Sequence, residues 1–168
     1  MHIRFAEQGD LEQIAALYRK NHLETYRGLL PQEYFSRLTP AFAEEKWRGW
    51  LEDPGRKLWI AVRDGAFLGF AAGREDPALP GTWYLDSLHV GRDARGQGVG
   101  TALIRAAGAY ACGRGLSRMS VCIVKGNDAA RKLYCGLGAE HLEDFEDDFC
   151  GTLSHSEKLV WNSTDIFR

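Results

Sequence analysis

The residues best suited to chemistry form the stretch Arg95-Gly96-Gln97-Gly98-Val99-Gly100-Thr101, in which three glycines alternate directly after an arginine. The stretch lies between a strand-like run at 83–90 and a long apolar run at 99–112 that is typical of a helix. Closely spaced glycines let the backbone turn its N–H groups toward one point, and at a helix N-terminus these groups favour an anion such as phosphate. Arg95 adds donors that match phosphate geometry. The stretch therefore predicts a phosphate-binding loop, with a ligand-free glycine turn as the alternative.

Spacing excludes two common phosphate-binding motifs here. A dinucleotide-binding fingerprint, G-x-G-x-x-G, would need a glycine at Thr101 or Leu103. A P-loop would end in Gly-Lys-Ser/Thr, and after the loop no lysine occurs before Lys125. The pattern that fits is R-x-x-G-x-G after a strand-like run at 85–90, and it resembles the acetyl-CoA pyrophosphate loop of the GNAT N-acetyltransferase superfamily.

A second block of residues makes the resemblance more specific. It follows a strand-like run at 119–124, at the distance where the superfamily has its second cofactor-contacting segment. The block consists of Asn127, Ala130, Leu133, Tyr134 and Gly138. The resemblance extends from Ile3 to about Trp161 and is weakest before Leu58. It implies the acyl-CoA N-acyltransferase (GNAT) fold and transfer of the acetyl group of acetyl-CoA to a primary amine of a small molecule or peptide, by direct attack in a ternary complex.

The same resemblance implies which residues hold acetyl-CoA. They are the backbone of Leu88 and Val90, the loop residues Arg95, Gly96, Gln97, Gly98, Val99, Gly100 and Thr101, and, in the second block, Asn127 and Ala130. In this superfamily the strand with the first two residues diverges from its neighbour, which frees backbone groups for the ligand. The alternatives are core packing for Leu88 and Val90 and helix capping for Asn127.

Tyr134 is the expected catalytic acid. Direct attack of an amine on the thioester expels a CoA thiolate. A phenol with an ordinary pKa of ~10 is protonated at neutral pH, so it can donate a proton or hydrogen bond to the leaving sulfur. The alternative is an aromatic side chain that only packs in the core.

A base must take a proton from the amine, directly or through water. The candidates are Asp86 and His89, each with a structural or surface role as the alternative. They are an odd number of residues apart, so in a regular strand they face opposite sides and at most one faces the site, unless a bulge breaks the alternation. By resemblance of position, Glu24 and Tyr26 are expected to contact the acceptor.

Composition indicates one globular domain. The chain has 168 residues, 45% of them hydrophobic, and a net charge of −2 at pH 7. The near-neutral charge predicts no nucleic-acid partner, and no apolar run approaches the ~20 residues that span a bilayer. We expect no membrane association, a cytoplasmic location, no metal site and reduced thiols, and we also consider a homodimer. The cysteines are Cys112, Cys122, Cys135 and Cys150.

A run of acidic residues near the C-terminus could have either of two roles. It is usually a solvated strand edge or loop, but it could attract a cationic acceptor such as a polyamine, an aminoglycoside or a lysine side chain. The run contains Glu140, Glu143, Asp144, Glu146, Asp147 and Asp148.

Hydrophobic periodicity predicts the elements that position these residues. The order β-α-α-α-β-β-β-α-β-α-β-β indicates an α/β (α+β) mixed sheet with helices on both faces, and it matches the GNAT order. We expect a single domain at 2–161 and a C-terminal tail at 162–168. Strands are expected at 2–6, 58–63, 67–73, 83–90, 117–124, 140–147 and 152–161, and helices after Asp10 and at 31–38, 39–51, 99–113 and 128–137.

Local signals refine three of these elements. Asp10 is the expected N-cap of the first helix, with Gln13 at the capping-box position. Asp64-Gly65 between apolar runs predicts a hairpin. In the third helix we expect core packing from Phe42, Trp47, Trp50 and Leu51.

Two alternatives to acetyl transfer remain open. One is a transferase of another acyl group on the same scaffold. The other is a non-catalytic acyl-CoA-binding sensor, against which the presence of Tyr134 argues.

Overall fold

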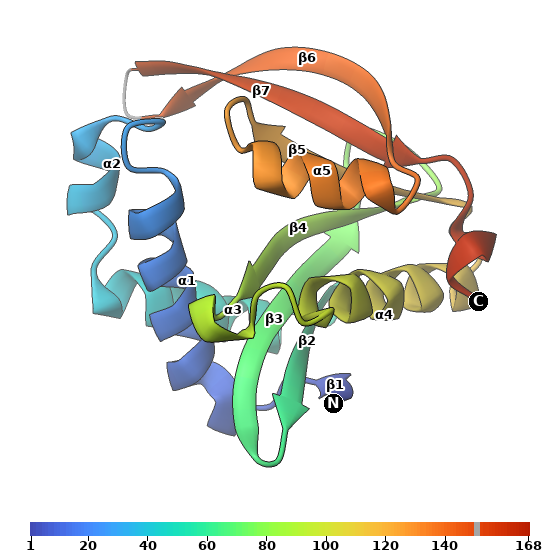
Figure 1. The fold of residues 1–168 in the computed structure, drawn as a ribbon, viewed down its shortest axis with the longest axis horizontal. Helices are drawn as coiled ribbons and strands as arrows, with labels where there is room; N and C mark the ends of the chain where they lie inside the picture. The colour runs from blue at the N-terminus through green and yellow to red at the C-terminus, as the bar shows by residue number, and fades with distance from the viewer. Residues whose placement is uncertain (150–151) are drawn as a thin grey trace.

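A seven-stranded mixed sheet forms the centre of the molecule (Figure 1), and the computed structural model describes residues 1–149 and 152–168. The strand order is β1-β2-β3-β4-β5-β7-β6, and every neighbouring pair is antiparallel except β4 and β5, which are parallel. The strands are β1 (His2–Phe5), β2 (Arg56–Arg63), β3 (Ala66–Glu75), β4 (Thr82–Val90), β5 (Arg118–Val124), β6 (Glu140–Phe149) and β7 (Thr152–Trp161).

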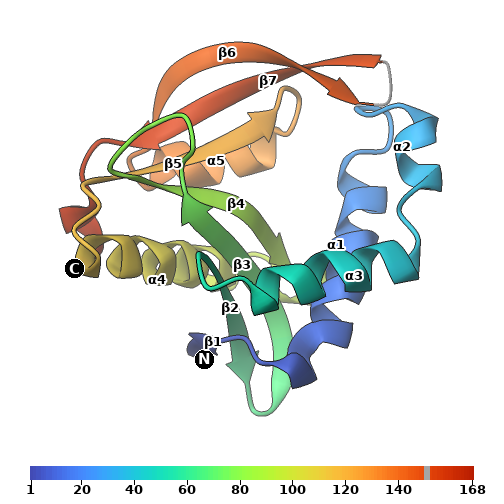
Figure 2. The ribbon, with the colours of Figure 1, turned by 180° about the vertical axis from the view of Figure 1, so that it is seen from behind.

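Helices cover both faces of this sheet. The helices α1 and α3 pack on one face and α4 on the other, as comparison of Figures 1 and 2 shows. The α-helices are α1 (Leu11–Thr25), α2 (Gln32–Ser36), α3 (Pro40–Glu52), α4 (Val99–Gly113) and α5 (Asp128–Gly136), and the 3-10 turns are η1 (Gln8–Asp10), η2 (Arg92–Ala94) and η3 (Thr164–Phe167). The expected mixed α/β order is therefore confirmed.

Successive side chains along the central strands point to opposite faces of the sheet and so contribute to two separate hydrophobic cores. On β2, Trp59 and Ala61 join the core beneath α4, whereas Leu58 and Ile60 join the core beneath α1 and α3. This period of two is what a strand buried on both faces requires. The hairpin that joins β2 to β3 turns at Asp64-Gly65, as predicted, with φ of 51° and 78°.

Two local predictions were wrong. Phe42 does not pack in the core, because it lies on the outer side of α3 and is 48% exposed, while Trp47 and Trp50 are buried. Asp10 occupies the N-cap position of α1 without capping it. Its carboxylate instead accepts hydrogen bonds from Arg4 and from the backbone N–H of Glu7, which closes the preceding 3-10 turn.

The segment at 162–168, expected as a tail, is anchored to the domain. It forms η3, and Phe167 is only 5% exposed. The ring of Phe167 lies so close to Gly108 of α4 that a Cβ there would be 2.2 Å from it. A glycine at this position therefore allows the chain end to pack against α4.

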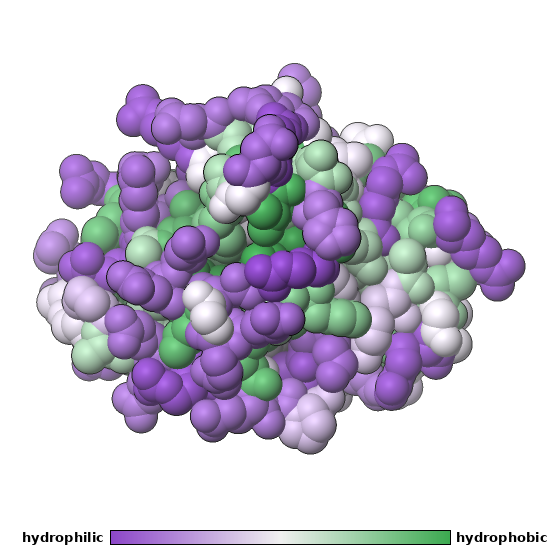
Figure 3. Space-filling view, turned by 90° about the horizontal axis from the view of Figure 1, so that it is seen from below, coloured by the Kyte–Doolittle hydropathy of each residue, from purple (hydrophilic) through white to green (hydrophobic). Residues whose placement is uncertain are grey.

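The surface mixes polar and apolar residues. Figure 3 shows the face at the end of the β2–β3 turn as mainly hydrophilic, with small separate apolar areas. Scattered apolar residues of this kind are common on monomers, so the homodimer stays a prediction. The large exposed apolar side chains of the described residues are Met1, Phe5, Leu29, Phe42, Leu142, Leu153 and Ile166.

Candidate active site

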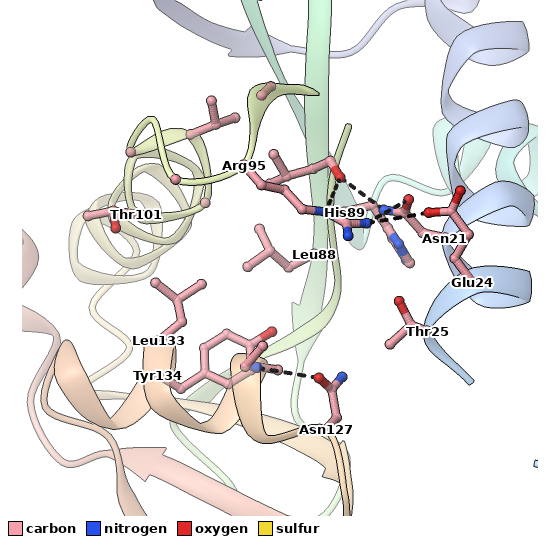
Figure 4. A pocket seen from close by; sticks show the side chains of 18 of the residues that line it. Asn21, Glu24, Thr25, Leu88, His89, Arg95, Thr101, Asn127, Leu133 and Tyr134 are labelled. Atoms are coloured by element: carbon pink, nitrogen blue, oxygen red, sulfur yellow. Dashed lines mark hydrogen bonds and ion pairs between the residues drawn. The ribbon is translucent and has the colours of Figure 1, made fainter. Parts of the chain in front are cut away.

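The strands β4 and β5 diverge at the centre of the sheet. They pair from Thr82 opposite Arg118 to Leu85 opposite Val121, and β4 then continues to Val90 without pairing to β5. A cleft of about 720 Å³ occupies this gap, and it reaches from the glycine loop to Tyr134 on α5 (Figure 4). The loop and the tyrosine therefore flank one cavity.

The glycine loop leaves unpaired amides at the start of α4. Gly96 and Gly98 have φ of 73° and 79°, a left-handed backbone conformation that residues other than glycine rarely adopt. The N–H of Ala102 donates to the carbonyl of Gly98 and makes the first hydrogen bond of the helix. The amides of Val99, Gly100 and Thr101 precede it and have no acceptor within the helix. These amides and the helix dipole suit a phosphate group.

Backbone groups of β4 complete one wall of the cleft. The N–H of Gly91 donates to Leu68 of β3, so in antiparallel geometry the backbone groups of Leu88 and Val90 point away from β3 and toward the gap. The carbonyl of Val90 already accepts hydrogen bonds from the Asn21 amide at 3.2 Å and from Arg95 Nε at 3.3 Å. The backbone groups that remain for a ligand on this wall are therefore the N–H and C=O of Leu88 and the N–H of Val90.

Arg95 crosses the cleft to α1. Its guanidinium donates to the Asn21 side-chain oxygen at 3.2 Å and lies 3.9 Å from a Glu24 carboxylate oxygen (Figure 4). Asn21 is 5% exposed and bonds both β4 and the loop. Asn21 was not among the residues predicted for the site, although its polar amide on the apolar stripe of a helix is a signal that could have identified it. Glu24 and Tyr26 also line the cleft.

The helix α5 positions Asn127 and Tyr134. Asn127 Oδ1 accepts from the backbone N–H of Ala130 at 3.4 Å, so Asn127 caps the helix, and Ala130 lines the cleft beside it. Tyr134 is 6% exposed and packs edge-on against Trp161, with ring centroids 5.8 Å apart. Burial raises the pKa of its hydroxyl well above the ordinary value, so the phenol stays protonated at neutral pH.

A bulge changes the expectation for the two candidate bases. The register between β3 and β4 shifts where Ala72 lies opposite Ser87 and Gly73 opposite Leu85, which leaves Asp86 as the extra residue. An extra residue reverses the alternation of side chains along a strand.

The side chains on the α4 side show this reversal. They are Trp83, Leu85, Leu88 and Val90, odd positions before the bulge and even positions after it. Asp86 and His89 consequently share the other face, and both line a second chamber of about 210 Å³. The exception named for a bulge therefore applies, because the strand is irregular at Asp86 and both side chains lie on one face.

The second chamber opens from the cleft on the α1 side of the sheet. The two cavities share a boundary made of Tyr26, Leu88, His89, Asn127, Ala130 and Tyr134. A ligand in the cleft and a ligand in the chamber would therefore meet beside Tyr134.

The two histidines of the chamber are neutral. His89 is 8% exposed and stacks on Phe70, with ring centroids 5.0 Å apart, and burial holds its pKa well below the ordinary value. Burial also lowers the pKa of His22 to about 3, and its Nδ1 forms a hydrogen bond with the Tyr34 hydroxyl. Burial thus makes both imidazoles weak bases, and the Asp86 carboxylate lines the same chamber as the other candidate proton acceptor.

The acidic run lies on β6, an edge strand of the sheet. Asp144 pairs with Lys125 at 2.8 Å, and Glu146 lies 3.5 Å from His155. Neither the cleft nor the chamber is lined by the acidic residues that the structure describes on β6, which agrees with the solvated edge rather than with an acceptor contact.

A group of potential metal ligands lies on β6 and the neighbouring strand β7. Atoms of His141, Asp144 and Glu157 lie within 4.8 Å of one another. However, Glu157 already accepts hydrogen bonds from Arg131 and His141, so its carboxylate is neutralised by the protein itself.

Two other expectations concern cysteines and membranes. Cys112, Cys122 and Cys135 are free thiols, as expected, and Cys150 lies outside the described residues. Within 1–149 and 152–168, no helix has the length and apolar character needed to cross a membrane.

Comparisons with known proteins agree with this geometry. Residues 22–138 match the model of the Acetyltransferase (GNAT) family. The thialysine N-epsilon-acetyltransferase of Bos taurus is 33% identical over 67 residues, which are 40% of this chain and only 39% of that protein.

Solved structures share the fold over nearly the whole chain. The ribosomal-protein-alanine N-acetyltransferase from Brucella melitensis superposes with a TM-score of 0.78 and 22% identity, over 96% of this chain and 99% of that one. The PaiA N-acetyltransferase from Thermoplasma acidophilum, solved with coenzyme A, has a TM-score of 0.72 and 18% identity, over 94% and 98%. Because the family match covers well over half of the sequence, including the glycine loop and Tyr134, this chain belongs to the GNAT acetyltransferase family.

Proposed function

We propose that this protein transfers the acetyl group of acetyl-CoA to a primary amine of a small molecule or peptide. The observation that carries the proposal is the cleft between β4 and β5, which gathers unpaired helix amides, free strand backbone and a protonated phenol around one gap. The pyrophosphate of acetyl-CoA would bind at Gly96, Gly98 and the first turn of α4. The pantetheine would extend along Leu88 and Val90, which brings the thioester to the boundary with the chamber.

The chemistry follows from the groups at that boundary. The amine nitrogen attacks the thioester carbonyl, a C–N bond forms and the C–S bond breaks, which releases the CoA thiolate and the acetylated amine. Tyr134 donates a hydrogen bond or its proton to the leaving sulfur, and a phenolate formed in this way takes a proton back from water. Asp86 takes the proton of the amine, directly or through water, because its carboxylate lines the same chamber in which the amine would lie.

Relatives support an amine acceptor of small or peptide type. One is a thialysine N-epsilon-acetyltransferase, and another is a ribosomal-protein-alanine N-acetyltransferase. Because the first match covers a minor part of that relative and the second is 22% identical, they support the reaction class and do not select between these acceptors.

Release of free CoA thiol from acetyl-CoA, measured over a panel of amines, tests the proposal. We expect amine-dependent thiol release together with calorimetric binding of acetyl-CoA. Binding without release from any amine would favour the non-catalytic acyl-CoA sensor. Faster turnover with succinyl-CoA or another acyl-CoA would favour a different acyl donor.

A further inference from the structure

The chamber next to the cleft holds one cationic and one anionic side chain that do not pair with each other. Lys46 of α3 and Asp86 of β4 both line it. Within the described part of the chain, Lys46 Nζ makes one long hydrogen bond of 3.5 Å, to the Tyr18 hydroxyl, and the Asp86 carboxylate accepts from the Ser87 hydroxyl at 3.2 Å. Among the described residues, neither Lys46 nor Asp86 has an ion-pair partner.

The Lys46 ammonium is poorly compensated by the protein. It lies 5.0 Å from the ring centroid of Tyr18 and 5.4 Å from that of Trp47, and these cation–π contacts offset part of its desolvation. Burial nevertheless lowers its pKa, and the attraction of Asp86 opposes that shift only in part. A half-buried cation without a counter-ion costs free energy that a bound anion would recover.

On the basis of the acetyl transfer proposed above, we infer that the acceptor is a small amino acid-type molecule, a primary amine that also carries a carboxylate. The carboxylate binds the Lys46 ammonium, and the amine lies on the Asp86 side of the chamber, toward Tyr134. Lys46 is then a residue that determines acceptor specificity and does not touch the reacting thioester.

The size and walls of the chamber agree with such an acceptor. Its volume of about 210 Å³ is below the roughly 300–1,000 Å³ of typical ligand pockets, so it suits a small molecule better than a folded protein surface. Aromatic rings of Tyr18, His22 and Tyr26 line it and would pack against an apolar or aromatic side chain.

Paired acceptors test the inference. The substrates are the protein amino acids, each compared with its carboxamide, which keeps the amine and removes the negative charge. Thiol release from acetyl-CoA should show a higher kcat/KM for the acids than for the amides. A charge-assisted hydrogen bond is typically worth about 10- to 100-fold, so Lys46→Met should lower kcat/KM for the acids by roughly this factor, chiefly through KM, and should lower it much less for the amides.

Matched variants separate this role from a structural one. Lys46→Arg should retain the preference for acids, and Lys20→Met, on the exposed side of α1, should behave like the wild type. Calorimetric binding of acetyl-CoA by Lys46→Met should equal that of the wild type, which reports an intact fold. Equal use of acids and amides by the wild type, or an equal loss on both in Lys46→Met, would overturn the acceptor assignment and leave acetyl transfer intact. Acetyl-CoA binding with no thiol release from any amine would overturn the transfer and the acceptor together.

Discussion

Tyr134 lines the boundary of the cleft and the chamber, and in the proposed reaction it is the acid for the leaving sulfur. Because burial raises the pKa of its hydroxyl, the phenol keeps its proton at neutral pH. We expect Tyr134→Phe to lower kcat by ~10²-fold, the low end for a general acid, since a CoA thiolate is already a tolerable leaving group. Acetyl-CoA binding should change little, because the phenyl ring still packs on Trp161.

Steady-state kinetics beside equilibrium binding of acetyl-CoA measures both quantities for this variant. A loss confined to the transition state lowers kcat and kcat/KM together. Turnover close to that of the wild type would show that Tyr134 only packs, and the acid would then be water or another group.

At the scale of single residues, sequence motifs singled out the glycine loop and Tyr134, which line one cleft in the structure, because glycine spacing and the register of the second block can be read from short segments. They did not identify Asn21 on α1 or Lys46 on α3, because these residues come close to the site only when the tertiary fold forms. The shared face of Asp86 and His89 was also beyond prediction, since it depends on a bulge that no turn residue marks.

The loop that begins α4 gives a prediction at the scale of one element. No heavy atom lies within 4 Å of a Cβ built on Gly98, so a substitution there meets backbone strain at φ 79° and no clash. Asn tolerates this conformation better than most residues, so Gly98→Asn and Gly98→Asp form a pair of nearly equal shape that differs in charge. We expect Gly98→Asp to bind acetyl-CoA at least 10-fold more weakly than Gly98→Asn, because its carboxylate repels the pyrophosphate at the helix N-terminus.

Calorimetric titration of both variants with acetyl-CoA, and with pantetheine as a ligand without phosphates, measures this difference. The two variants should bind pantetheine alike. Equal affinity of the two variants for acetyl-CoA would place the pyrophosphate elsewhere.

A second element-scale prediction concerns the link between the end of β3 and the strands β5 and β7. The buried carboxylate of Asp76 accepts from Lys158 at 2.7 Å and from Ser120 at 2.6 Å. Burial raises the pKa of Asp76, but the hydrogen bonds from Lys158 and Ser120 outweigh it and the net shift is downward. A carboxyl whose folded pKa lies below its unfolded value of ~3.9 stabilises the protein above that pH. This stability is lost as the pH falls through the folded pKa.

Denaturant unfolding between pH 7 and pH 3 checks this link. At pH 7, Asp76→Asn should lower the free energy of unfolding by about 3–5 kcal/mol, because it leaves the Lys158 ammonium buried without its partner. The difference between wild type and variant should shrink at the acidic end. The double variant with Lys158→Met should recover much of the loss, and a loss that stays constant with pH would contradict the ion pair.

At the scale of the whole molecule, the order of elements and the covered mixed sheet could be predicted from the sequence, because strand and helix periods differ and the hairpin and cap residues mark most boundaries. Residues 162–168 could not be placed, since the burial of Phe167 depends on a glycine of α4 far away in the sequence. The divergence of β4 and β5 was implied only by resemblance, because pairing between distant strands leaves no local signal.

Occupation of the cleft should stabilise the fold as a whole. The cleft is made by β4, α4, α5 and the end of α1, and these elements are brought together only in the native state. A ligand that binds only the native state adds about 2.7 kcal/mol when its concentration is 100 times Kd. For a domain of this size that corresponds to a rise of roughly 5–10 °C in Tm.

Thermal unfolding with increasing acetyl-CoA measures this stabilisation. Tm should continue to rise with the logarithm of acetyl-CoA concentration above Kd, as mass action requires. Gly98→Asp should need a higher concentration for the same shift, whereas Tyr134→Phe should follow the wild-type curve, because the phenol acts on the leaving sulfur and not on ground-state binding. If Gly98→Asp followed the wild-type curve instead, the stabilising ligand would not occupy the glycine loop, and the cleft between β4 and β5 would lose its assignment as the acetyl-CoA site.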